Sequence, residues 1–160
     1  PVLIREEIIN ISRDINKLLS RFIRGQLVVA AIVGVLSIIA LLILKVKFAL
    51  LIGTIAGITN IVPYFGPIIG SIPAVIIALL DKPIKALWVV LAFFIIQQIE
   101  SAILSPKIVG DSVGLHPVFV IVVLLIGGEL FGIVGLLFAV PIAASIKVIL
   151  NHIARILIKI

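Results

Sequence analysis

The chain has 160 residues, of which 63% are hydrophobic, and its mean hydropathy is +1.47. Soluble domains are usually about 45–50% apolar, so this composition excludes a soluble globular protein and predicts a membrane protein. The net charge is +6, but Lys and Arg lie at the ends of apolar runs, where they meet lipid headgroups, which argues against a nucleic-acid partner. The absence of cysteine excludes disulfides and thiolate metal sites.

Residues 1–26 are predicted to form an amphipathic juxtamembrane helix. Apolar side chains recur there at alternating spacings of four and three, from Ile4 to Phe22. Two interpretations remain open: an interfacial helix or inter-subunit coiled segment, and a linker helix that packs on another domain. Residues 27–44 follow as a transmembrane helix. Because the chain begins with Pro1 and contains no Met, we expect it to be part of a longer protein.

Residues 48–80 contain no charged side chain. A continuous helix of that length would be roughly 50 Å long, whereas the hydrocarbon core of a bilayer is about 30 Å thick. Pro63 and Pro67 each remove a backbone donor, and Gly66 lies between them. We expect two half-helices that fold back at residues 60–67 as a re-entrant hairpin. The alternative is two full spans joined by a Pro-rich loop outside the membrane.

Residues 86–104 are predicted to cross the membrane again, and residues 105–117 are polar and rich in Gly and Pro, as is typical of a loop. Residues 118–150 are apolar and broken by the glycine-rich stretch 127–132, which predicts a second hairpin. Two helix–hairpin pairs that start from opposite sides are typical of an inverted-topology repeat. The predicted fold is all-α: a polytopic transmembrane protein with two broken, re-entrant hairpin segments and an inverted repeat.

The basic residues separate into two groups in this topology. One side carries Arg5, Arg13, Lys17, Arg21, Arg24, Lys107, Lys147, Arg155 and Lys159, and the other carries Lys45, Lys47, Lys82 and Lys85. The positive-inside rule then places both ends of the segment on the cytoplasmic side of the cell membrane. The predicted parts are the juxtamembrane helix at 1–26, a transmembrane transport core at 27–150 and a basic cytoplasmic tail at 151–160.

Glu100 is the most informative charged residue, because it lies near the end of an apolar helix. Gln97 is three positions earlier and shares its face. A carboxylate within a membrane segment is by default a functional hypothesis, here a proton or cation site. The alternative is a helix-end carboxylate that pairs with Lys107.

Asn60 and Tyr64 flank the predicted tip of the first hairpin. Free carbonyls there, with the Asn60 side chain, could bind a cation or a polar solute, and the helix that begins after Pro67 favours an anionic group at its N-terminus. The alternative is that Asn60 only satisfies carbonyls freed by Pro63 and Pro67.

Glu129 lies beside Gly127 and Gly128 at the predicted tip of the second hairpin. It is a site carboxylate if that tip reaches the bilayer midplane and an ordinary loop carboxylate if the tip reaches water. His116 and His152 are each far from another type of ligand, so no metal site is predicted. The motifs H-E-x-x-H, G-x-S-x-G and Walker A are missing. We therefore expect no enzyme and no cofactor, apart from a coupling H⁺ or Na⁺.

Several stretches, taken in order, resemble one family of membrane transporters, the AI-2E transporter family of PerM-like permeases. They are FIRGQ (Phe22–Gln26), NIVPYFGPIIGSIPA (Asn60–Ala74), QQIE (Gln97–Glu100), SPKIVGDSVGLHP (Ser105–Pro117), GGELFGIVG (Gly127–Gly135) and AVP (Ala139–Pro141).

The resemblance implies transport: export of the signal autoinducer-2 in some members, and sodium or lithium/proton antiport in others. It also implies a homo-oligomer and an elevator-like movement. The motif positions carried over to this chain are Asn60, Pro63, Phe65, Gly66, Pro67, Gln97, Glu100, Pro106, Gly110, His116, Pro117, Gly128, Gly132 and Pro141. The position of Glu129 is not fixed in the family pattern.

The leading hypothesis is a secondary transporter in the lipid bilayer, in which the two hairpin tips meet around a small polar solute or a monovalent cation. Its candidate binding residues are Asn60, Pro63, Tyr64, Phe65, Gly66, Pro67, Gln97, Glu100, Gly127, Gly128 and Glu129. The alternatives are a sodium(lithium)/proton antiporter, a non-transporting membrane scaffold whose amphipathic helix recruits partners, and a passive channel.

Overall fold

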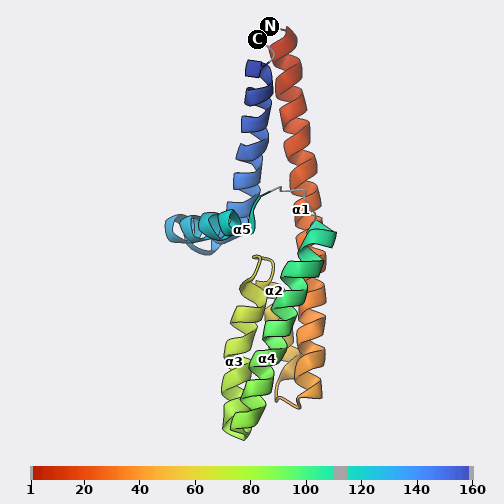
Figure 1. Ribbon diagram of the computed structural model, residues 1–160, viewed down its shortest axis with the longest axis vertical. Helices are drawn as coiled ribbons and strands as arrows, with labels where there is room; N and C mark the ends of the chain where they lie inside the picture. The colour runs from red at the N-terminus through yellow and green to blue at the C-terminus, as the bar shows by residue number, and fades with distance from the viewer. Residues whose placement is uncertain (1, 110–114, 159–160) are drawn as a thin grey trace. The chain divides into compact units, whose positions relative to one another are not determined.

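The computed structural model describes residues 2–109 and 115–158, and every element in these two ranges is a helix (Figure 1). The elements are α1 (Val2–Ile43), α2 (Ala49–Thr59), α3 (Phe65–Asp81), α4 (Pro83–Ile99), the π-helix η1 (Glu100–Val109) and α5 (Pro117–Ile158). By length and composition, the segments able to cross a membrane are Ile9–Ile43, Pro83–Val109 and Val118–Ala154. The prediction of an all-α polytopic membrane protein is confirmed.

The chain forms two compact units. One is Arg24–Gly110; the other is Pro1–Ile23 together with Asp111–Ile160. Helix α1 runs without a break from Val2 to Ile43 and contributes to both. The predicted juxtamembrane helix and the first predicted span are therefore parts of one helix.

Small residues set the helix packing in the unit Arg24–Gly110. Helix α3 packs against both α2 and α4, and the core between them includes Ala56, Ala74 and Phe93. Helices α1 and α2 approach closely where Gly34 lies against Gly57, since a Cβ added at Gly57 would lie 2.9 Å from Gly34 Cα. Small residues at such crossings are typical of membrane helices.

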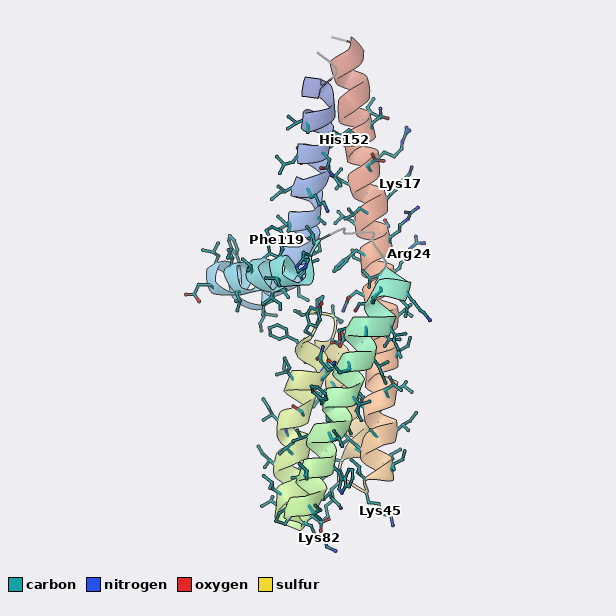
Figure 2. All side chains as sticks on the ribbon, in the orientation of Figure 1. Lys17, Arg24, Lys45, Lys82, Phe119 and His152 are labelled. Atoms are coloured by element: carbon teal, nitrogen blue, oxygen red, sulfur yellow. The ribbon has the colours of Figure 1, made fainter. Side chains whose placement is uncertain are left out.

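The helix ends near Lys45 and Lys82 lie together at one end of this unit (Figure 2). The Nζ of Lys85 donates a hydrogen bond to the main-chain oxygen of Lys45 at 3.0 Å and forms an ion pair with Asp81. The hydrogen bond and charge of Lys85 hold the pKa of Asp81 below its ordinary value. These contacts link the turn between α1 and α2 to the turn between α3 and α4.

The first predicted hairpin is confirmed as a pair of helices that fold back on each other (Figure 1). The turn between α2 and α3 is shorter than expected, because α3 already begins at Phe65. Pro67 therefore lies in the first turn of α3, where its missing N–H leaves no hydrogen bond unmade. The prediction that the helix begins after Pro67 is wrong by a few residues.

The loop predicted at residues 105–117 is wrong for its first part. Helix α4 continues into η1, which carries the helical path past Pro106 to Val109. Gly25 of α1 permits close packing there, because a Cβ added to it would lie 3.0 Å from the main-chain oxygen of Ile108. Residues 110–114 lie outside the described residues, and residues 115 and 116 are not helical.

Helix α5 is broken at Gly132, whose φ of 60° and ψ of −139° are not helical. The two halves turn back on each other, since a Cβ added to Gly127 would lie 2.7 Å from the main-chain oxygen of Gly135. A helical hairpin at the glycine-rich stretch is thus confirmed. In the same unit His152 Nε2 lies 3.6 Å from Asp14 Oδ2, which joins the last part of α5 to the first part of α1 (Figure 2).

Candidate functional site

The polar centre of the unit Arg24–Gly110 lies where three segments far apart in sequence meet. Helix α1 supplies Gln26, the turn after α2 supplies Asn60, and the junction of α4 with η1 supplies Glu100. All three side chains are buried. Burying polar groups is costly unless they are hydrogen-bonded, so the partners of these three side chains indicate which atoms remain available to a ligand.

Asn60 is the residue that joins the segments. Its Nδ2 donates to Glu100 Oε1 at 2.9 Å, and its Oδ1 accepts the main-chain N–H of Gly66 at 3.1 Å. The alternative that Asn60 only satisfies carbonyls freed by the two prolines is therefore wrong. The side chain instead closes the turn by accepting an N–H and holds the carboxylate of Glu100.

Glu100 is only 1% exposed and lies in a segment that is apolar enough to cross a membrane. None of the ion pairs of the described residues involves it, so the alternative of a helix-end carboxylate paired with Lys107 is wrong. The main-chain amide of Tyr64 lies near the carboxylate. Even so, Oε2 has no hydrogen-bond partner among the described residues.

Gln97 adds a second buried acceptor one turn before Glu100. Its Oε1 also has no hydrogen-bond partner within the described part of the chain. The main-chain oxygen of Gln97 accepts the N–H of Glu100, so the two residues follow one another along the same helix. The prediction that they share a face is in keeping with this spacing.

The remaining predicted residues of the first hairpin surround Asn60. Pro63 and Tyr64 form the turn, Tyr64 with a left-handed φ of 70°, and Phe65, Gly66 and Pro67 begin α3. A side chain at Gly66 would not fit, because its Cβ would lie 2.7 Å from Asn60 Oδ1. The geometry of the turn therefore requires glycine at position 66.

Gln26 is a further candidate site residue, which the sequence offers only as the last letter of the stretch FIRGQ and not as a binding residue. Its Nε2 donates to the main-chain oxygen of Asn60 at 2.6 Å, which ties α1 to the same turn. The sequence holds a weak signal for it, because Gln26 is the last polar residue before the apolar run 27–36. Such a position is ordinary at a membrane boundary, so it did not stand out.

The predicted site residues of the second hairpin belong to the other unit. Gly127 and Gly128 are half-buried and Glu129 is exposed on α5. The expectation that the two tips meet stays a prediction.

Metal binding finds no support in the residues that the structure describes, where no group of three or more potential ligands gathers. His116 Nδ1 accepts the main-chain N–H of Val118 at 3.3 Å, an ordinary helix-start contact. A groove of about 310 Å³ runs along α1 and α2, lined by side chains such as Ala31, Val35 and Ile58. None of the candidate site residues lines this groove.

Comparison with known proteins gives consistent matches. Residues 1–155 match the family described as "AI-2E family transporter". YrrI and YueF of Bacillus subtilis (strain 168), both candidate transport proteins, are 46% and 36% identical over 143 and 157 residues. These alignments cover 89% and 98% of this chain, but 40% and 42% of the relatives. The AI-2 transport protein TqsA of Escherichia coli (strain K12) is 29% identical over 136 residues, covering 84% of this chain and 40% of TqsA. The chain thus spans about two fifths of the length of these relatives.

Proposed function

Since the chain belongs to the AI-2E transporter family, we propose that it forms part of a secondary transporter that moves a small polar solute across the cell membrane. The single observation that carries this proposal is the buried hydrogen bond between Asn60 and Glu100. Buried ionisable side chains in membrane-spanning helices commonly belong to substrate or ion pathways. Because the chain covers about two fifths of its relatives, the solute belongs to the whole protein.

Autoinducer-2 is the solute we favour. The support is the similarity to TqsA, an AI-2 transport protein. A small hydroxyl-rich molecule is matched by the kind of groups gathered around Asn60, which are amide and carboxylate oxygens and main-chain N–H groups.

The length of α2 supports a re-entrant first hairpin. Helix α2 has 11 residues, which gives about 16 Å at ~1.5 Å per residue, well short of a ~30 Å hydrocarbon core. Transporters commonly place such broken helices at their binding sites, within inverted repeats. We propose that this hairpin moves in an elevator-like manner and that the protein is a homo-oligomer. Both ends of this segment are then cytoplasmic.

Exchange of a monovalent cation for protons is a second candidate function. Glu100 Oε2 favours it, because a buried carboxylate oxygen without a donor is suited to bind H⁺ or Na⁺. In that case Glu100 would bind the cation that is itself transported, and not an ion that drives the transport of a solute.

The test uses the full-length protein in sealed proteoliposomes loaded with labelled autoinducer-2 and a pH-sensitive dye. We expect solute efflux from wild type, an at least tenfold loss in Asn60→Ala and Glu100→Gln, and near-normal efflux in Gln98→Ala. Gln98 is the matched control, because it lies beside Gln97 but is exposed. A pH change on adding sodium without solute efflux would favour cation/proton exchange. Equal rates in all four proteins would reject both functions for this site.

A further inference from the structure

Two buried oxygen atoms without partners lie one helical turn apart, at the junction of α4 and η1. They are Oε1 of Gln97 and Oε2 of Glu100. Glu100 is 1% exposed, so water does not provide the missing partner from the surface. Unpaired buried polar atoms are uncommon in folded proteins, and each needs a physical explanation.

The chemistry of the two atoms indicates what is missing. An ionised carboxylate and an amide oxygen are both acceptors, so neither can satisfy the other. A protonated carboxylic acid, in contrast, has one O–H donor. We propose that Glu100 holds a proton on Oε2 and donates it to Gln97 Oε1. One hydrogen then satisfies both atoms, and it also removes the cost of an unpaired charge in an apolar interior.

The surroundings of Glu100 are consistent with a neutral acid. The elements packed around it contribute the Asn60 amide, the nearby main-chain N–H of Tyr64 and the Tyr64 phenol. The phenol is the nearby titratable group, and phenols are uncharged near pH 7. Lys107 lies on the same π-helix, yet no ion pair of the described residues joins it to Glu100.

Asn60 connects this proton site to the turn of the first hairpin. Its Nδ2 donates to Oε1, the oxygen that carries no proton, while its Oδ1 accepts the N–H of Gly66. Loss of the proton would leave a buried anion whose Oε2 has no donor among the described residues, so water or a cation would have to stabilise that oxygen. Release of the proton therefore favours an opened turn. This inference rests on the proposed transport function, for which it names H⁺ as the coupling ion.

The test is infrared spectroscopy of the full-length protein in lipid vesicles during a pH titration. A protonated carboxylic acid has a carbonyl stretching band that the carboxylate lacks. We expect this band in wild type at pH 7 and its loss in Glu100→Gln. In Gln97→Leu the band should remain, shifted to higher frequency because the O–H has lost its acceptor. The control variant Gln98→Leu should match wild type in both respects.

Three results would overturn the proposal. One is a wild-type band that Glu100→Gln leaves unchanged, and another is a Gln97→Leu band at the wild-type frequency. The third is a Glu100 band that is missing at pH 7. A band that appears only after sodium is removed would assign the site to Na⁺. A band that is missing both with and without sodium would mean that Glu100 is ionised and accepts a hydrogen bond from the amide N–H of Gln97.

Transport measured on the same vesicles separates this inference from the proposed function. Solute efflux without the Glu100 band would leave the transport function intact and reject the proton site. The band without any efflux would support the proton site and reject the transport function.

Discussion

Asn60 and Glu100 are forty positions apart in sequence and are joined by a hydrogen bond of 2.9 Å between Asn60 Nδ2 and Glu100 Oε1. This bond connects the turn of a helical hairpin to the point where an α-helix becomes a π-helix. Because both side chains are buried, a change in one reaches the other without passing through solvent.

Replacing Asn60 removes two hydrogen bonds at once. Asn60→Ala leaves the Gly66 N–H without its acceptor and Glu100 Oε1 without its donor. Each buried polar group left alone costs roughly 1–3 kcal/mol. We expect a lower melting temperature in detergent and loss of transport. Thr59→Ala is the control, because Thr59 is half-buried and its hydroxyl bonds only to its own helix. An unchanged melting temperature for Asn60→Ala would show that the two bonds contribute nothing.

Asn60→Asp tests the charge of the site rather than its shape. The new carboxylate would face Glu100 Oε1 in place of an N–H donor. Two acidic groups sharing a buried site cannot both ionise at low cost. We therefore expect transport by this variant to be weak at pH 7 and to recover partly at lower pH, as measured by solute efflux. Equal losses at all pH values would indicate a purely structural defect.

Gly66→Ala should open the turn of the first hairpin. The added Cβ would lie 2.7 Å from Asn60 Oδ1, and backbone surrounds it on another side. Overpacking of this kind costs about 1–3 kcal/mol. Gly128→Ala is a matched control, since its Cβ would meet only the flexible side chain of Leu136, at 3.0 Å. Thermal unfolding of the two variants should differ clearly, and similar curves would contradict the assigned role of Gly66.

Gly53→Ala should separate α1 from α2. Its Cβ would lie 2.7 Å from the main-chain N of Ile38, which cannot move without shifting the whole of α1. We expect reduced stability together with slower transport. Thr54→Ala serves as the neighbouring control, because Thr54 is exposed and bonds only to Leu50 of its own helix. A stable, fully active Gly53→Ala protein would argue against close packing at this crossing.

The absence of cysteine from this segment allows the re-entrant hairpin to be tested by single-cysteine labelling. The background is the full-length protein with any cysteines elsewhere replaced. We expect Lys47→Cys and Lys82→Cys to react quickly with an impermeant maleimide from the extracellular side. Ile61→Cys, in the turn, should react slowly from either side, because the proposed re-entrant hairpin places the turn at mid-depth. Fast labelling of Ile61→Cys from the cytoplasm would instead show two full spans.

The residues of the candidate site could be found from the sequence, whereas their connection could not. Asn60 and Glu100 stand out because each is a polar residue in a long apolar stretch. Their hydrogen bond depends on where the hairpin folds back relative to α4, which periodicity does not specify. Closeness in sequence offers Lys107 as an alternative partner, whereas the structure pairs Glu100 with the distant amide of Asn60.

The sequence predicts where the helices turn back, though not whether the hairpins are re-entrant, because Pro and Gly have strong local effects on the backbone. The same rule fails at residues 105–109, where a polar stretch rich in Gly and Pro predicts a loop but the structure has a helix. Long π-helices are rare, so a sequence gives little reason to expect one. Here η1 continues the path of α4 past Pro106 to the contact between Gly25 and Ile108.

The π-helix η1 could also convert to α-helix, and this change would combine a rotation with a translation along the helix axis. Its ten residues are wound with hydrogen bonds one residue longer than those of an α-helix, so the segment is wider and shorter than the same residues would be as α-helix. Rewinding it as α-helix would rotate Ile108 and Val109 about the helix axis and shift them along it, which would change their close packing against Gly25. Glu100 is the first residue of η1. Binding or release of a proton at its carboxylate would therefore act at the start of the π-helix.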